Sequence, residues 1–424
     1  MLTSQDPRLA GRVAFSYPNF VSFIAARFFM VLALEMLSVA VGWQVYDITH
    51  RAIDLGYVGL AQFLPGFVLF LVSGHATDIF NRRKLLIACY AAYAICSALL
   101  LAISWGAPRS VHLIYVVLVT MGTVRTFNFP ASRAFLPQLV PEEHFENAVA
   151  WNASTFQMAT IAGPALGGIA YAISHGPHIV YAIAALVAVV SVVLTTRIHP
   201  MTEGKRPKEP VRLRSVLAGF RFIWEKKVIL GSISLDMFAV LLGGAVALLP
   251  IYAKEILRTG PWGLGLLRSA PGVGAAVMAI AVAHYPIRRR AGLTMLFCVA
   301  AFGVFTIAFG LSRNLIVSLA ALFFVGASDM VSVIIRATLV QIATPDEMRG
   351  RVNAVDMLFI GVSNQLGEFE SGITAQWFGT VPAVVFGGLG TLGVIALWAW
   401  LFPELRRADR LTAAELAPDE ASLT

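Results

Sequence analysis

Charged residues are scarce in this chain of 424 residues, because Asp, Glu, Lys and Arg together make up only 13% of it. A soluble globular domain has about 25% charged residues and roughly 50% apolar residues. Here 58% of the residues are hydrophobic. This composition excludes an ordinary soluble protein and is typical of a chain that crosses a membrane many times.

Cysteine and the usual cofactor motifs are also scarce or missing. The three cysteines, Cys89, Cys96 and Cys298, lie within apolar runs, so we expect packing and no disulfide framework. The sequence contains no GxxxxGK[ST] motif and no HExxH or similar metal spacing, so we expect no cofactor and no metal site. "GLGTLG" at 388–393 fits a dinucleotide pattern, but it lies inside an apolar run with no strand before it.

Long apolar runs, in contrast, fill most of the chain. About 20 mostly apolar residues are enough for a helix to cross the hydrocarbon of a membrane. Twelve runs meet this need, and we therefore predict an all-α integral membrane protein with twelve transmembrane helices. The predicted spans are 20–47, 55–76, 84–105, 111–136, 148–174, 178–197, 229–252, 263–286, 292–311, 315–341, 353–378 and 382–402.

The positions of Lys and Arg predict the orientation of these spans. If the N-terminus is cytoplasmic, 22 bases fall on the inner side and only 5 on the outer side. Positive residues concentrate on the cytoplasmic side of membrane proteins, so we expect both termini to be cytoplasmic. The same bias explains the net charge of +8 without nucleic acid as a partner. We expect a protein of the inner (plasma) membrane.

One long connection divides the predicted spans into two sets of six. It begins with a Pro- and Lys-rich stretch, followed by a predicted amphipathic helix with Val216, Phe220, Ile223 and Trp224 on one face. The predicted organisation is a cytoplasmic segment 1–19, a six-helix half 20–197, a cytoplasmic linker 198–228, a second half 229–402 and a cytoplasmic tail 403–424.

The two halves show a weak internal repeat. "LAQFLPG" (60–66) matches "LLRSAPG" (266–272), and "RAFLPQLVPEE" (133–143) matches "RATLVQIATPDE" (336–347). "LALEM" in the first span likewise matches "SISLDM" in the seventh. These matches follow one order at an offset of about 205 residues, which predicts two parallel six-helix repeats, a known transporter architecture.

Charged residues inside the predicted spans are the candidates for function. A charge at the bilayer centre costs about 2.5–3.5 kcal/mol on insertion scales, so such residues should face a protein interior or a cavity. Eleven lie within or near the spans: Arg27, Glu35, Arg125, Arg133, Asp236, Arg268, Asp329, Arg336, Asp356, Glu368 and Glu370.

The acids among them are candidates for binding and releasing a proton. Glu35 and Asp236 occupy matching places in the first and seventh spans, and Asp329 lies in the tenth. The alternative is that each is permanently paired with an arginine or held by the amides of a helix end. Glu368 and Glu370 are two residues apart, so they lie about 200° apart on a helix and only one of them can face a given cavity.

Two arginines and three aromatic residues complete the set of candidates. Arg125 is expected to pair with an acid or to fix the coupling site, and Arg268 either does the same or reaches the outer surface. Phe28, Phe63 and Phe127 are candidates for apolar contacts with an amphipathic substrate, the alternative being that they only pack. We expect a small-molecule substrate, protons and the lipid bilayer as partners, and a monomer.

The connection after the second span, "GHATDIFNRRK", resembles the loop signature of the major facilitator superfamily, G-x-x-x-D-R/K-x-G-R-R/K. Gly74, Asp78, Arg82 and Arg83 match it, whereas Ile79 and Asn81 replace a base and a glycine. The resemblance implies twelve spans in two halves. We hypothesise that Asp78 latches the halves on the cytoplasmic side, the alternative being a cap on the second span.

Two further motifs indicate the direction of transport. Arg125 matches the fourth-span arginine of this superfamily. In the fifth span, Gly163, Pro164, Gly167 and Gly168 match Gly-Pro-x-x-Gly-Gly, the end of its antiporter signature, whose upstream glycines are absent here. "PASRAFLPQLVP" and "PDEMRGRVNAV" are similar to the branch with enterobactin exporters and macrolide efflux proteins. This resemblance implies proton-driven export of a drug, macrolide or siderophore. Proton-linked uptake and a non-pumping sensor or assembly protein of the same fold are the alternatives.

Overall fold

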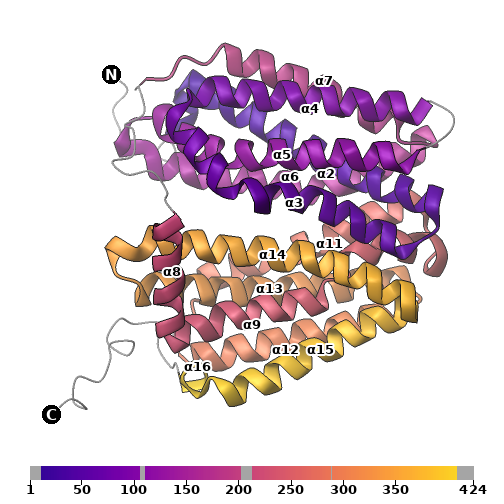
Figure 1. The fold of residues 1–424 in the computed structure, drawn as a ribbon, viewed down its shortest axis with the longest axis vertical. Coiled ribbons are helices and arrows are strands. Elements are labelled where there is room, and N and C mark those ends of the chain that lie inside the picture. The colour runs from indigo at the N-terminus through magenta and orange to yellow at the C-terminus, as the bar shows by residue number, and fades with distance from the viewer. Residues whose placement is uncertain (1–10, 106–109, 202–212, 288, 408–424) are drawn as a thin grey trace. The chain divides into compact units, whose positions relative to one another are not determined.

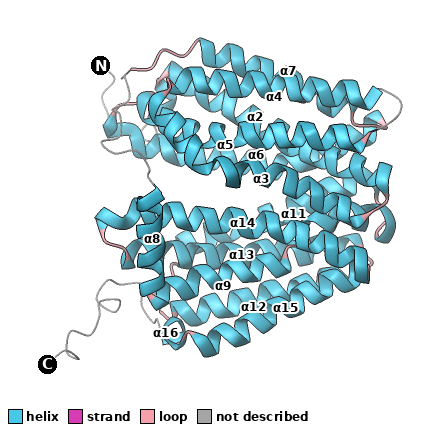
Figure 2. Cartoon of the chain, in the orientation of Figure 1, coloured by secondary structure: helices cyan, strands magenta, loops and turns pink. Residues whose placement is uncertain are grey.

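The computed structural model describes residues 11–105, 110–201, 213–287 and 289–407. All regular elements in these ranges are helices, and no strand occurs among them (Figures 1 and 2). The predicted all-α class is confirmed for this part of the chain. The long helices are α2 (Pro18–Thr49), α3 (Ala52–Ile79), α4 (Arg82–Trp105), α5 (Val111–Phe135), α6 (Phe145–Ser174), α7 (His178–Thr196), α8 (Leu213–Glu225), α9 (Lys227–Gly243), α11 (Gly260–His284), α12 (Ala291–Leu311), α13 (Leu315–Ala343), α14 (Asp346–Phe378) and α15 (Thr380–Leu401).

Short helical pieces connect or extend these helices. They are η1 (Val13–Ser16), η2 (Leu136–Gln138), η3 (Glu142–His144), η4 (Ala245–Leu248), α10 (Leu249–Ile251), the π-helical turn η5 (Tyr252–Ile256) and α16 (Pro403–Arg407).

Eleven helical stretches in the described ranges are long and apolar enough to cross a membrane. They coincide with eleven of the predicted spans. The remaining predicted span, 353–378, lies within the 33-residue helix α14, whose charged residues keep it outside this group. The count of twelve spans and the side of the membrane on which the termini lie stay predictions.

The chain divides into two compact units. Unit 1 comprises Met1–His50, Ala61–Val211 and Thr259–Ser269, and unit 2 comprises Arg51–Leu60, Arg212–Arg258 and Ala270–Thr424. Helix α3 therefore begins in unit 2 and continues in unit 1, whereas α11 begins in unit 1 and continues in unit 2. The predicted boundaries of the two halves stay a prediction.

The same helix pairs recur in both units. In unit 1, α2 packs against α6 and α7, and α4 packs against α5 and α7. In unit 2, α9 packs against α14 and α15, and α12 packs against α13 and α15. Because these helices follow one another in the same order, the packing repeats the pattern that the sequence offset of about 205 residues predicts.

Glycines allow close helix contacts at equivalent places in each unit. In unit 1, a Cβ atom added to Gly168 of α6 would lie 2.9 Å from the Cα atom of Gly265 in α11. In unit 2, a Cβ atom added to Gly372 of α14 would lie 3.0 Å from the Cα atom of Gly56 in α3. Close backbone approach of this kind stabilises helix pairs in lipid, where the hydrophobic effect does not drive association.

The seventh span departs from the predicted continuous helix. Helix α9 ends at Gly243, and Gly244 leaves the helical conformation before η4, α10 and η5 continue the span. The hydroxyl of Ser371 donates to the freed carbonyl of Gly244 at 2.9 Å. Irregular backbone at membrane depth is tolerated where the surrounding protein satisfies its polar groups.

Helix α8 lies in the predicted linker and packs against α14. Ile223 is buried with Ile229 and Val352, whereas Phe220 and Trp224 are exposed. Of the residues predicted to share one apolar face, Ile223 is buried, and Phe220 stacks on Phe359 of α14 although it is exposed. The side chain of Val216 lies outside the described part of the structure.

Candidate functional site

The most buried group of charged side chains lies in unit 2 around Arg336 of α13. Asp329, Ser332 and Arg336 are spaced three and four residues apart, so they form one stripe along this helix. The side chain of Asn314 caps the first turn of α13 by accepting bonds from the amides of Ile316 (2.8 Å) and Val317 (3.3 Å). Helix α13 presents the Arg336 end of this stripe to α9 and α14.

Arg336 joins two carboxylates from different helices. Its Nη1 atom donates to Oδ1 of Asp356 in α14 at 2.5 Å, and its Nη2 atom lies 3.4 Å from Oδ2 of Asp236 in α9. The side chain of Arg336 is only 4% exposed and that of Asp236 only 8%. Removal from water is costly for ions, so these charges are stable only because they are paired.

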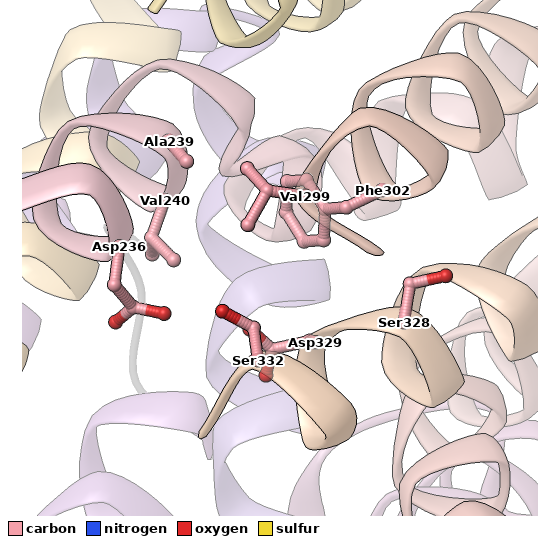
Figure 3. Close-up of a pocket in the computed structure, with 8 residues that line it drawn as sticks. All are labelled: Asp236, Ala239, Val240, Val299, Phe302, Ser328, Asp329 and Ser332. Atoms are coloured by element: carbon pink, nitrogen blue, oxygen red, sulfur yellow. The ribbon is translucent and has the colours of Figure 1, made fainter. Parts of the chain in front are cut away.

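Asp329 adds a third carboxylate to this group. It lines a small cavity together with Asp236 and Ser332, and it interacts electrostatically with both Asp236 and Arg336. Figure 3 shows the side chains of Asp236, Asp329 and Ser332 around this space, with Val299 and Phe302 on another side. We call Asp236, Asp329, Arg336 and Asp356 the Arg336 cluster.

Ser332 provides a polar group in the cavity that lacks a protein partner. Its side chain is 1% exposed, and its hydroxyl makes no hydrogen bond to the described residues. A buried hydroxyl without a partner costs about 1–3 kcal/mol. The cavity therefore offers an unsatisfied hydroxyl beside two carboxylates.

A second charged group, in unit 1, contains Glu35. This half-buried carboxyl of α2 interacts electrostatically with Arg268 of α11 and with Arg125 of α5. The Nη1 atom of Arg268 also donates to the carbonyl of Ser38 at 3.1 Å. Arg268 is thus held within unit 1 and close to an acid, and its role stays a prediction.

The Gly-Pro-x-x-Gly-Gly motif forms the wall beside Glu35. A Cβ atom added to Gly163 would lie 2.5 Å from the Cβ atom of Glu35, and one added to Gly167 would lie 2.6 Å from the Cα atom of Met36. Gly168 meets α11, as described above, and Pro164 is buried inside α6. The motif therefore gives α6 a surface of small residues on which α2 and α11 pack closely.

The remaining predicted acids contact different neighbours. The Glu368 carboxylate covers Gly59 of α3, because a Cβ atom added to Gly59 would lie 2.5 Å from its Oε2 atom. The Oε1 atom of Glu370 accepts a bond from the hydroxyl of Thr374 at 2.7 Å. The two carboxyls therefore have different surroundings, as the predicted angle between them requires.

Arginine and phenylalanine side chains pair twice in unit 1. The guanidinium of Arg133 lies over the ring of Phe129 at 4.5 Å, and that of Arg27 lies over the ring of Phe156 at 5.3 Å. Both distances are within the range of cation–π attraction. Arg27 also donates a hydrogen bond to the side-chain oxygen of Asn152.

The predicted cavity aromatics are half-buried, and two of them pack against a neighbouring ring. The ring of Phe28 meets Phe29 edge to face at 5.3 Å, and the ring of Phe63 lies 5.8 Å from that of Phe67. Phe127 is half-buried in α5. Contact between these rings and a substrate stays a prediction.

The loop motif after the second span anchors helix ends of unit 1. Gly74 lies within α3, and α4 begins at Arg82, whose Nη1 atom donates to the carbonyl of Ala134 at 3.3 Å. Arg83 donates to the carbonyls of Thr195 and Thr196 at the end of α7. Cations at helix C-termini are favourable because the last carbonyls lack partners. The side chain of Asp78 lies outside the described part of the structure.

Asn81, which replaces the usual glycine of the loop motif, stabilises the start of α4. Its side-chain oxygen accepts a bond from the amide of Lys84 at 3.2 Å, so it caps the first turn of α4.

Sequence reasoning named Arg336 and Asp356 only as intramembrane charges and gave them no role. The spacing of Asp329 and Arg336 by seven residues places them on one helix face and could have indicated a joint site. Among the described residues, no group of three or more His, Cys, Asp or Glu is arranged to hold a metal ion.

A family model of the major facilitator superfamily, described as "Transmembrane secretion effector", matches residues 13–423 of this chain. The chain belongs to this superfamily. It is therefore a multi-pass membrane transporter of the major facilitator type and not an enzyme.

Curated relatives include two enterobactin exporters named EntS. One is from Shigella boydii serotype 18 (strain CDC 3083-94 / BS512) and the other from Escherichia coli O1:K1 / APEC. Each is 26% identical to this transporter over 398 residues, which is 92% of this chain and 94% of the relative.

Solved structures of transporters resemble most of the chain. A bacterial homolog of the human lysosomal transporter Spinster, inward-facing and occupied, matches with a TM-score of 0.72 and 12% identity over 93% of this chain and 98% of its own. A D-xylose-proton symporter matches with a TM-score of 0.67 and 14% identity over 91% and 98%. At these identities the likeness shows the fold alone.

Proposed function

We propose that this transporter exports a small amphipathic molecule, such as a drug, macrolide or siderophore, in exchange for protons. It would act as a monomer in the inner (plasma) membrane, with both termini in the cytoplasm. The direction is supported by the whole-length similarity to proteins named enterobactin exporters. Transport would follow alternating access, in which two repeats move against each other around a central site.

The Arg336 cluster is the observation that carries proton coupling. Three carboxylates share the space around one guanidinium, so full ionisation would leave an excess of two negative charges in a buried place. Uncompensated buried charge costs several kcal/mol per ion, and binding of a proton removes it. Because Asp236 and Asp356 form the ion pairs with Arg336, we assign the transported proton to Asp329.

Glu35 is the second candidate for proton binding. It lies in unit 1 and interacts electrostatically with Arg268 and Arg125. A proton that reached Glu35 would weaken the attraction that holds Arg268 of α11 near α2. Protonation here would therefore loosen a contact between helices, whereas protonation of Asp329 would relieve repulsion.

Proton coupling can be tested with purified protein in proteoliposomes that contain a pH-sensitive dye. An outward gradient of enterobactin, erythromycin or Hoechst 33342 should drive proton movement in the opposite direction. Asp329→Asn should reduce this proton movement at least tenfold, since the amide cannot release a proton at neutral pH. Asp346→Asn, at an exposed position at the start of α14, is the matched control and should leave it unchanged.

Two results would contradict the proposal. One is cargo flux in the unmodified protein that does not depend on the proton gradient for any of the three compounds. The other is equal proton movement in Asp329→Asn and in the Asp346→Asn control, which would remove the assignment of Asp329.

A further inference from the structure

We propose that the small cavity beside Arg336 in unit 2 is a binding site for one sodium ion. The ligands are the carboxylates of Asp236 and Asp329 and the hydroxyl of Ser332. This ion is bound whether or not cargo and protons move across the membrane, so the sodium site goes beyond the proposed function and does not depend on it.

Three helices of unit 2 enclose the cavity. Its polar lining residues are Asp236 of α9 and Ser328, Asp329 and Ser332 of α13, and Val299 and Phe302 of α12 form an apolar wall (Figure 3). The cavity volume of about 10 Å³ has room for a single water molecule or for an ion of similar size. The occupant must therefore be small, and the polar wall requires that it be polar or charged.

Oxygen atoms that face this cavity lack direct partners. Asp236 meets Arg336 as an ion pair at 3.4 Å, but within the described residues no hydrogen bond reaches the carboxylate of Asp236 or that of Asp329. The hydroxyl of Ser332, a side chain that is only 1% exposed, also lacks a hydrogen bond there. Figure 3 shows the side chains of Asp236, Asp329 and Ser332 directed into the same space.

The charges around the cavity favour a cation over a water molecule. Arg336 is bonded to Asp356 at 2.5 Å and lies farther from Asp236, so Asp236 and Asp329 share one guanidinium that is already engaged elsewhere. Buried carboxylates are stable only when their charge is compensated. A water molecule brings no charge, whereas a cation is attracted by both carboxylates and is coordinated by the hydroxyl of Ser332 as well.

Size and coordination favour a monovalent cation. Mg²⁺ retains several water molecules, and Ca²⁺ takes about six to eight oxygen ligands. A cavity with room for one small sphere and with two carboxylates suits neither ion. The site also differs from the clusters of three or more His, Cys, Asp or Glu that hold such metals, none of which occurs among the described residues. Na⁺ needs fewer charged ligands and is smaller than K⁺.

The test compares thermal unfolding in three salts. The full-length protein in lipid nanodiscs is heated in NaCl, KCl or choline chloride at equal concentration, without cargo and without a proton gradient. A ligand that binds only the folded state raises the Tm, and we expect NaCl to raise it by about 2 °C or more over choline chloride, whose cation is too large for the cavity. KCl should raise the Tm less, because K⁺ is larger. Binding of radioactive Na⁺ to the same nanodiscs gives the affinity.

Variants then locate the ion. Ser332→Ala removes one oxygen ligand and should weaken Na⁺ binding about tenfold, since a polar contact with a charged group is worth about that factor. Its Tm in choline chloride should stay unchanged, which excludes misfolding, because the hydroxyl has no partner among the described residues. Asp329→Asn should remove the difference in Tm between NaCl and choline chloride.

Ser97→Ala is the matched control. Ser97 of α4 is 0% exposed, and its hydroxyl likewise lacks a partner among the described residues, but it lies in unit 1 and does not line the cavity. Na⁺ binding should therefore be the same in Ser97→Ala as in the unmodified protein.

Three outcomes would overturn the sodium site. They are equal Tm values in NaCl and choline chloride without binding of radioactive Na⁺, Na⁺ binding that persists undiminished in Ser332→Ala, and a loss of Na⁺ binding in Ser97→Ala as large as that in Ser332→Ala. The first would leave a water molecule as the occupant of the cavity. Na⁺ binding without proton movement in the liposome assay would instead reject proton coupling and retain the sodium site.

Discussion

Units 1 and 2 repeat one helix arrangement but place opposite charges at equivalent positions. The fourth helix of unit 1, α5, contains Arg125 where its counterpart in unit 2, α13, contains Asp329. Likewise, α6 contains the neutral Asn152 where α14 contains Asp356. The repeat therefore fixes where polar side chains lie. Substitution within it gives the charged group of unit 1 two arginines beside Glu35, and the Arg336 cluster of unit 2 three acids beside one arginine.

This difference suggests a division of tasks between the units. An acid-rich group can take up and release protons, whereas arginines stay charged at neutral pH. The proposed proton coupling depends on this asymmetry, so variants at equivalent positions of the two units can break it or sharpen it.

The largest expected effect on the free energy of unfolding concerns an arginine that occurs at equivalent positions in the two units, Arg336 in unit 2 and Arg133 in unit 1. Arg336→Ala leaves buried carboxylates without their partner, which should lower the free energy of unfolding by about 3–5 kcal/mol. Arg133→Ala removes an exposed side chain from a cation–π contact and should cost about 1 kcal/mol or less. Chemical denaturation in detergent micelles measures the loss of stability in both variants.

Asp236→Asn combined with Arg336→Ala provides the control for this comparison. Removing one acid along with the arginine should restore part of the lost stability, since less uncompensated charge remains. Equal destabilisation by Arg336→Ala and Arg133→Ala would show that burial does not distinguish the two units.

An intermediate effect on the free energy of unfolding is expected at the equivalent glycines Gly168 and Gly372. The added Cβ of Gly168→Ala would lie 2.5 Å from the backbone oxygen of Pro261 in α11, so backbone must move, at a cost of about 1–3 kcal/mol. The contacts of Gly372→Ala are 3.0 Å or longer, and alanine is favoured over glycine in helices by up to about 1 kcal/mol. We expect Gly372→Ala to be close to neutral.

Gly393→Ala is the matched control, because nothing lies within 4 Å of its added Cβ. It should raise the free energy of unfolding by up to about 1 kcal/mol through helix propensity alone. Thermal unfolding ranks the stabilities of the three variants. A larger loss of stability in Gly372→Ala than in Gly168→Ala would contradict the contact geometry.

The sequence predicted the helices well because each is a long apolar run bounded by polar residues. The predicted span 292–311, for example, nearly coincides with α12, Ala291–Leu311. The interruption at Gly244 was not predicted, since the apolar run continues through it and the compensating bond comes from Ser371, far away in the sequence.

The groups of charged side chains could be predicted only in part. The cost of charge in lipid indicated that Asp236, Asp329 and Arg336 face the protein. The spacing of the last two by seven residues was an unused signal that they share one side of a helix. Their partners could not be predicted, because Asp356 joins them from another helix through tertiary packing. The pairing of Arg27 with Phe156 and Asn152 was missed for the same reason.

The smallest effect concerns the first turns of the equivalent helices α5 and α13. The side chain of Asn314, the N-cap of α13, accepts bonds from two backbone amides, whereas that of Ser110, the N-cap of α5, makes no such bond. Asn314→Ala should therefore cost about 1 kcal/mol and Ser110→Ala only a few tenths. Hydrogen exchange at the amides of Ile316 and Val317 should accelerate in Asn314→Ala, since these donors lose their acceptor. If Ser110→Ala were equally costly, the two helix starts would be equivalent in solution, and the asymmetry between the units would be confined to their charged side chains.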